Sequence, residues 1–355
     1  MLWYHSALEP FLDHTYKVEQ GVQCDLRIFP SESTSTGIPT PWVLYVHGGA
    51  FVAGKHYVPN AWVVPALRPR AYHVVSVSYR FAPHCSLSQQ VGDVKDAFEW
   101  CQTNLPRILS VNGAKVDLER YVVIGESAGG LIVSLLPFVL DPKPRVVVDI
   151  YGPTDLAAQH WSSTPSNANE DGGNTVHIQP LSGEFPEDEV INAAKSRDAS
   201  LAMTVCPFEF DVPVETYRDL WKVPDYEYTR EQRFQYDIKR HLRTTKTLID
   251  VLLRKEECQS DEEWRKRLED HSPVHLLRQR GSYPPTVLLY GKDDPVVPLD
   301  QAASFAGILR ENKVDVIELY EPGEGHEFDN KYTAPAVEGW HTYIAPIIQF
   351  VEKHV

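Results

Sequence analysis

The sequence predicts an α/β fold, with a mostly parallel, doubly wound sheet and a helical cap inserted between two of its core strands. Short apolar runs alternate with amphipathic stretches as far as Leu156, which is the order of a parallel sheet with crossover helices. Several runs, such as Val122–Ile124 and Val146–Val148, are continuously β-branched, as in strands buried on both faces. The alternation stops after Leu156 and resumes near Pro284, which leaves room for the cap.

The expected elements follow this alternation. We expect strands at Gln23–Phe29, Trp42–His47, His73–Tyr79, Tyr121–Ile124, Arg145–Tyr151, Thr286–Tyr290 and Asp315–Tyr320. Crossover helices are expected at Ser88–Asn104 and Ser127–Leu140, and a last amphipathic helix at Tyr343–Lys353.

The stretch Ala157–Arg280 contains no convincing strand. Its residues 187–199, 229–254 and 261–269 are highly charged and look helical, so we divide the chain into core 1–156, cap 157–280 and core 281–355. A separate domain is the alternative, but it would leave the sheet incomplete. The aromatic residues of the cap either line an acyl or ring pocket or, as we favour for most of them, form the cap's own core: Trp221, Tyr226, Tyr228, Phe234 and Tyr236.

The composition limits which partners the protein can bind and indicates the compartment in which it works. Acidic side chains exceed basic ones by 15, and no lysine and arginine block could follow a phosphate backbone, so nucleic acid is a poor partner. The five cysteines are widely spaced without a CxxC pair, which favours isolated thiols in a reducing compartment. The chain starts without the pattern of a signal peptide, and no apolar run is long enough to span a bilayer. We therefore expect a cytoplasmic protein without stable membrane insertion.

A nucleophile motif stands between an expected strand and an expected helix. Strand Tyr121–Ile124 runs into Gly125-Glu-Ser-Ala-Gly-Gly130, which matches Gly-x-Ser-x-Gly. In this context Ser127 is expected at a sharp, strained turn, with glycines where side chains would collide, and with the positive end of the next helix directed at it. The bare pattern occurs by chance, but the flanking strand and helix make it specific.

A second glycine motif follows another expected strand, in Val46-His-Gly-Gly-Ala-Phe51. Acyl chemistry passes through an oxyanion, and consecutive glycines let backbone N–H groups turn toward it. We expect Gly48 and Gly49 to supply two donors and Ala128 a third. The alternative is a plain glycine turn, which the nucleophile motif makes the weaker interpretation.

The two motifs together resemble the hormone-sensitive-lipase family of α/β-hydrolases, which pairs His-Gly-Gly with Gly-[Asp/Glu]-Ser-Ala-Gly-Gly. Residues 17–155 and 280–352 carry the resemblance, including Tyr151-Gly-Pro-Thr-Asp-Leu156. It implies that His47 shapes the oxyanion loop and is buried and hydrogen-bonded, and that His84 is structural. Most family members build their cap from a long N-terminal segment plus a shorter insertion, whereas only sixteen residues precede the stretch that carries the resemblance here.

A serine needs a base to take its proton and a carboxylate to hold that base, in the chain order Ser, acid, His. His326, in Gly323-Glu-Gly-His-Glu-Phe328, follows the last expected strand, and we assign it as the base. The loop Gly291-Lys-Asp-Asp-Pro-Val-Val-Pro298 offers two acids, of which the resemblance favours Asp294 over Asp293. Glu126 is expected to point away from Ser127 and to anchor the turn by hydrogen bonds.

The leading hypothesis is a serine hydrolase that cleaves a carboxylic ester of a small or medium-sized substrate, with Ser127, Asp294 and His326 as catalytic triad. One alternative keeps the acyl-enzyme but changes the acceptor or bond, as in an acyltransferase, thioesterase, lactone-forming enzyme or arylformamidase. Another is a binding protein without catalysis, although no triad member is missing. We expect no organic cofactor and no metal; the oligomeric state is left open.

Overall fold

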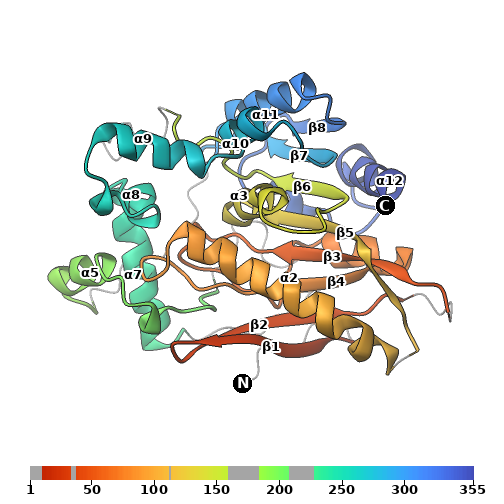
Figure 1. Ribbon diagram of the computed structural model, residues 1–355, viewed down its shortest axis with the longest axis horizontal. Coiled ribbons are helices and arrows are strands. Elements are labelled where there is room, and N and C mark those ends of the chain that lie inside the picture. The colour runs from red at the N-terminus through yellow and green to blue at the C-terminus, as the bar shows by residue number, and fades with distance from the viewer. Residues whose placement is uncertain (1–9, 33–36, 112, 159–183, 208–227) are drawn as a thin grey trace.

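A single eight-stranded sheet forms the centre of the molecule in the computed structural model, which describes residues 10–32, 37–111, 113–158, 184–207 and 228–355. The strands lie in the order β1-β2-β4-β3-β5-β6-β7-β8 (Figure 1). β1 pairs with β2 and β2 with β4 in antiparallel fashion, and every later pair is parallel. The strands are β1 (Leu12–Glu19), β2 (Val22–Phe29), β3 (Thr40–Val46), β4 (His73–Val77), β5 (Val116–Glu126), β6 (Val146–Ile150), β7 (Thr286–Gly291) and β8 (Val316–Glu321). The α/β-hydrolase fold predicted from the sequence is therefore confirmed.

Helices cover the sheet and extend beyond one end of it. The α-helices are α1 (Val63–Leu67), α2 (Leu87–Ser110), α3 (Ala128–Leu135), α5 (Glu187–Ala194), α7 (Arg230–Thr244), α8 (Leu248–Leu252), α9 (Asp261–Asp270), α10 (Pro273–Arg280), α11 (Leu299–Glu311) and α12 (Ala345–His354). Short turns of other helix types are η1 (Arg68–Arg70), η2 (Leu136–Phe138), η3 (Ala199–Leu201), η4 (Lys255–Glu257), η5 (Phe328–Lys331) and η6 (Trp340–Ile344). α2 and α3 lie in front of the sheet in Figure 1, while α5, α7, α8 and α9 gather at its left. Among the described residues, no helix is both long and apolar enough to cross a membrane.

The seven predicted strands are confirmed, and an eighth strand, β1, was missed. Strands β3, β4, β6 and β7 are almost wholly buried, so their apolar runs identified them. β1 is an edge strand whose residues are mostly exposed or half-buried. Its sequence, LDHTYKVE, has few apolar residues, and for that reason the first strand was expected only at Gln23.

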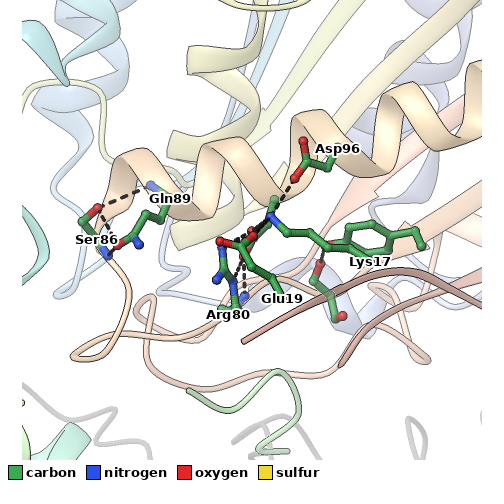
Figure 2. Close-up of polar contacts among 9 residues, drawn as sticks. Lys17, Glu19, Arg80, Ser86, Gln89 and Asp96 are labelled. Carbon is green, nitrogen blue, oxygen red and sulfur yellow. Dashed lines mark hydrogen bonds and ion pairs between the residues drawn. The ribbon is translucent and has the colours of Figure 1, made fainter. Parts of the chain in front are cut away.

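β1 is fixed to α2 by a cluster of ion pairs (Figure 2). Lys17 Nζ lies 2.8 Å from Asp93 Oδ1, 2.6 Å from Asp96 Oδ2 and 2.5 Å from Glu19 Oε2. Arg80 Nη2 lies 2.7 Å from Asp93 Oδ1 and 3.2 Å from Glu19 Oε2. Among the described residues, Glu19, Asp93 and Asp96 are the only group close enough together to hold a metal ion. Because each of these acids is already paired with Lys17, Arg80 or both, the cluster is explained as a structural link between the edge strand and α2.

The described part of the segment between β6 and β7 consists of helices joined by loops and turns. The predicted helices are found as α5, as α7 followed by α8, and as α9, while α10 was not predicted. Helix α11, which follows β7, was not predicted either. The described part of this segment contributes no strand to the sheet, and its one β-bridge joins Cys206 to Gly54. The boundaries 157 and 280, which separate cap from core, remain a prediction.

Candidate active site

Ser127 lies in a strained turn between β5 and α3. Its φ is 51° and its ψ is −117°, a combination that only a strongly constrained non-glycine residue adopts. The Ser127 N–H donates to Ile150 O at 2.8 Å, which ties the turn to β6. A Cβ atom on Gly125 would lie 2.3 Å from Gly129 O, and one on Gly129 would lie 2.1 Å from Val46 O. The predicted need for glycine at these two positions is thus confirmed.

His326 connects the serine to a buried carboxylate. Ser127 Oγ and His326 Nε2 are 2.9 Å apart, and His326 Nδ1 and Asp294 Oδ2 are 2.7 Å apart. An ionised carboxylate only accepts hydrogen bonds, so Nδ1 carries the proton and Nε2 is free to accept the proton of Ser127. The structure therefore brings the three predicted residues into one hydrogen-bonded chain, from loops that follow β5, β7 and β8.

The two adjacent aspartates of the β7 loop point in different directions. Asp294 is 7% exposed, and its Oδ1 accepts the N–H groups of Val296 and Val297 at 2.8 and 2.9 Å. These two bonds fix the carboxylate and leave Oδ2 for His326. Asp293 is exposed, and it stabilises the loop through its backbone N–H, which donates to Glu324 O. The geometry thus favours Asp294 as the acid.

Several acidic groups surround His326. Burial alone would lower the pKa of His326, but the charge and hydrogen bond of Asp294, followed by the charges of Glu327 and Glu126, raise it above the usual 6.5. Burial raises the pKa of Glu327 to about 8 and that of Glu126 to about 7. The imidazolium that forms when His326 takes a proton is therefore stabilised by its surroundings.

The glycine loop, residues 47–54, lies directly beside Ser127. A Cβ atom on Gly48 would lie 3.1 Å from Ser127 Cβ, so the loop backbone approaches the nucleophile closely. The Gly48 N–H, expected in the oxyanion hole, donates instead to Glu126 Oε1 at 3.1 Å. The N–H groups of Gly49, Ala50 and Ala128 make no hydrogen bond to any residue that the structure describes. Within the part of the chain that the structure describes, Gly49, Ala50 and Ala128 thus keep N–H groups without a hydrogen-bond acceptor. Ala50 stands inside the quoted motif but was not among the predicted donors.

Three other predictions about individual residues agree with the structure. His47 is 2% exposed and its ring stacks on Tyr79 with centroids 4.6 Å apart. Burial lowers the pKa of His47 to about 4, so the neutral ring donates from Nδ1 to Gly48 O at 2.7 Å. Glu126 anchors the turn as expected, because its two carboxyl oxygens bond to Gly48 N and to the Tyr151 hydroxyl. His84 is 6% exposed, and its carbonyl accepts from Arg254 Nη2, as expected of a structural residue.

The cap segment touches the glycine loop through α7. Gln235 is 3% exposed, and its Nε2 donates to Val52 O at 2.8 Å and to Ala82 O at 2.9 Å. Of the five aromatic residues singled out, Trp221 and Tyr226 lie outside the described residues. The other three pack in the cap: Phe234 against Phe185, and Tyr228 against Tyr236.

Family models match both halves of this site. A model described as α/β-hydrolase fold matches residues 43–205, which contain both glycine motifs and Ser127. A model of the prolyl oligopeptidase family matches residues 229–344, which contain Asp294 and His326. The resemblance inferred from the motifs is thereby confirmed at the level of the α/β-hydrolase fold.

The curated relatives are polyketide synthases much longer than this chain. The chain is 25% identical over 344 residues to the non-reducing polyketide synthase stbA of Stachybotrys bisbyi, covering 95% of this chain and 14% of the synthase. It is 27% identical over 346 residues to the non-reducing polyketide synthase mapC' of Penicillium brevicompactum, covering 92% of this chain and 15% of the synthase. The chain therefore spans only about a seventh of the length of these relatives.

Solved structures share the fold at low identity. An α/β-hydrolase superfamily protein from Enterococcus faecalis superposes with a TM-score of 0.58 at 14% identity, covering 96% of this chain and 97% of that one. Esterase 2 of Thermogutta terrifontis superposes with a TM-score of 0.57 at 14% identity, covering 99% and 98%. At this sequence identity the structural similarity supports the fold alone.

Proposed function

We propose that this α/β-hydrolase is a serine esterase that cleaves the carboxylic ester of a small or medium-sized substrate through an acyl-enzyme on Ser127. One observation carries the proposal: an unbroken chain of hydrogen bonds from Ser127 Oγ through His326 to Asp294, at 2.9 and 2.7 Å. Each atom in that chain has the donor or acceptor capacity that nucleophilic acyl chemistry requires.

The steps follow from the geometry. His326 Nε2 takes the proton of Ser127 as the serine oxygen attacks the ester carbonyl, and Asp294 supports the resulting imidazolium. His326 then gives this proton to the leaving alcohol, and water releases the acyl group by the same steps in reverse. A raised pKa of His326 suits the proton transfers from His326 to the leaving group, because the protonated imidazole must persist long enough to act as an acid.

The oxyanion is stabilised by backbone N–H groups that donate to no other described residue. The predicted hole was Gly48, Gly49 and Ala128; we retain Gly49 and Ala128 and add Ala50 as the third candidate donor. Gly48 contributes indirectly, because its bond to Glu126 holds the loop in place beside Ser127. Such preorganised donors contribute several kcal/mol, on the order of 3 kcal/mol for each donor removed in other serine hydrolases.

A fluorophosphonate and a series of p-nitrophenyl esters test this proposal. The probe should label the protein once, at Ser127, and Ser127→Ala should abolish both labelling and ester turnover, a loss on the order of 10⁶-fold in kcat by analogy with other triads. The matched control is Ser134→Ala, which removes a buried hydroxyl from the same helix without touching His326. Labelling that survives Ser127→Ala would overturn the assignment.

A second candidate function is acyl transfer or thioester cleavage with the same acyl-enzyme. It is favoured by the curated relatives, which are polyketide synthases by name, and by the nature of the chemistry, since an acyl-enzyme can deliver its acyl group to water, an alcohol or an amine. Rates with matched aromatic acyl esters and N-acetylcysteamine thioesters, each with and without an alcohol acceptor, separate the candidates. Faster turnover of the thioester, or an acyl product on the acceptor, would favour the second.

A cytoplasmic location belongs to the same proposal. All five cysteines are free thiols, and Cys24, Cys85, Cys101 and Cys206 are buried. This pattern supports a reducing compartment. Cell fractionation with an antibody against the protein tests it, and recovery in a secreted or membrane-bound fraction would contradict it.

A further inference from the structure

Tyr151 is a fully buried residue with a positive φ at the point where β6 enters the active site. Its φ is 42° and its side chain is 0% exposed. The Tyr151 N–H donates to Leu289 O at 2.9 Å, which holds the backbone against β7. A bulky aromatic residue rarely adopts such a φ, and it persists only where the surrounding structure fixes it.

The hydroxyl of Tyr151 lies between two buried carboxyl groups. It donates to Asp329 Oδ1 at 2.7 Å, and Glu126 Oε2 lies 3.3 Å from the same oxygen. Asn60 Nδ2 donates to the phenol oxygen at 3.1 Å. The phenol has one proton, and the shorter distance identifies Asp329 as its main acceptor.

The two carboxyl groups belong to different parts of the site. Glu126 precedes Ser127 and accepts the Gly48 N–H, so it holds the glycine loop. Asp329 stands three residues after His326 in η5, where Trp62 Nε1 and Asn60 Nδ2 each donate to its Oδ2 at 2.7 Å.

The ring of Tyr151 contacts the base itself. Its centroid lies 4.5 Å from that of the His326 imidazole, with 53° between the planes. A single side chain thus touches the base through its ring and both carboxyl groups through its hydroxyl.

Because the two carboxyl groups are buried, they depend on these hydrogen bonds. Burial raises the pKa of Glu126 to about 7 and that of Asp329 above its usual value, and the donors from Asn60, Tyr151 and Trp62 counteract the effect on Asp329. A buried carboxyl that loses a donor is left in an unfavourable environment, so we expect the surrounding loops to shift until it recovers a partner.

We propose that Tyr151 is a positioning residue that couples the glycine loop, held through Glu126, to the loop that carries His326. The inference rests on the proposed function, since it assigns Tyr151 a role in presenting the base and the oxyanion donors of that same site. Tyr151 acts through Glu126, Asp329 and His326 and takes no part in bond making or breaking.

The decisive substitution is Tyr151→Phe, which keeps the ring against His326 and removes only the hydroxyl. We expect kcat for p-nitrophenyl esters to fall about 10- to 100-fold, because small displacements of catalytic groups have effects of that size, while KM changes by less than about twofold. The rate of fluorophosphonate labelling at Ser127 should fall by a similar factor. A role confined to stability would leave both rates of the folded protein unchanged.

Tyr283→Phe is the matched control. Tyr283 is also buried, and its hydroxyl donates to Ser134 O at 2.7 Å, away from the triad. This control should lose stability without losing kcat. A Tyr151→Phe variant with the kcat and labelling rate of the control would overturn the proposal.

A double-mutant cycle tests the route of the coupling. Glu126→Gln keeps an acceptor for Gly48 N, and in that background Tyr151→Phe should cost at least about threefold less in kcat than it does alone. Additive losses would overturn the coupling through Glu126.

If Tyr151→Phe does not fold, Asp329→Asn serves in its place, because it preserves volume and an acceptor oxygen but changes the partner of the phenol. It should show the same loss of kcat at constant KM, and unchanged kcat would overturn the proposal. A wild-type protein that neither labels nor hydrolyses esters would refute the proposed function itself. A reactive wild type with an equally reactive Tyr151→Phe would refute only the role of Tyr151.

Discussion

The parallel sheet and helix α7 of the segment between β6 and β7 bury different kinds of residue. Strands β6 and β7 are buried at every position and β3 at every position but Thr40, and the side chains of these three strands are mostly valine, isoleucine and leucine. In α7 the buried residues are mostly polar or charged, and α9 has none buried. The sheet is thus stabilised by apolar packing, whereas α7 combines the two apolar residues Ile238 and Leu242 with specific polar contacts.

The same difference separates the roles of the two regions. The proposed triad lies on loops at the ends of β5, β7 and β8, where the packed strands fix each side chain. From the segment, Gln235 reaches the glycine loop through two hydrogen bonds to backbone carbonyls. Changes at the strand ends should therefore affect the chemistry strongly, and changes in the segment should have smaller effects.

The largest expected effect distinguishes two neighbours on one loop. Asp294→Asn should lower kcat by about 10⁴-fold, because the imidazole loses the acceptor that fixes its tautomer. Asp293→Asn should change kcat by less than about threefold, since exposed substitutions shift free energies by about 0.5 kcal/mol or less. Both variants are assayed with the best p-nitrophenyl ester after circular dichroism confirms folding. A large loss in Asp293→Asn alone would transfer the role of the acid to that residue.

The pH dependence tests the charges around the base. His326 accepts a proton only when neutral, so kcat/KM should fall about tenfold per pH unit below its pKa, which lies above 6.5 because the surrounding carboxylates outweigh burial. In Asp294→Asn the strongest of these charges is gone, and the acidic limb of the residual activity should move to lower pH. A limb that stays in place would mean that Asp294 does not set this pKa.

Gln235→Leu tests the contact between the segment and the sheet. It leaves the carbonyl oxygens of Val52 and Ala82 without their donor in a buried place, so we expect the free energy of unfolding to fall by about 2 kcal/mol. Urea denaturation measures this change. A loss below about 0.5 kcal/mol would show that water replaces the amide and that the segment is only loosely attached.

The smallest effect is expected on α9. Lys266 and Asp270 form an exposed pair one turn apart, with Nζ and Oδ2 2.6 Å apart. Lys266→Ala should lower the free energy of unfolding by less than about 0.5 kcal/mol, because solvent screens such pairs. A loss as large as that of Gln235→Leu would contradict the contrast between the two regions.

Local patterns in the sequence were enough for much of this protein. The buried strands could be recognised in the sequence as continuous apolar runs, because a strand covered on both faces has no polar side. Ser127 and His326 were predicted because the turn between a strand and a helix, and the loop after the last strand, are each determined by adjacent residues. Asp294 was preferred over Asp293 because of the resemblance to the hydrolase family, and the hydrogen bonds of Asp294 are consistent with that preference.

Contacts between residues far apart in the chain were decided only by the tertiary structure. The edge strand β1 is stabilised by ion pairs with Arg80 and α2 rather than by an apolar pattern. The Gly48 amide, one of the predicted oxyanion donors, pairs with a carboxylate 78 residues away. The Tyr151 hydroxyl meets Asp329 across 178 residues. Periodicity and motifs report what adjacent residues impose on one another, whereas the pairing of a buried polar group depends on which groups the packed sheet brings within hydrogen-bond distance.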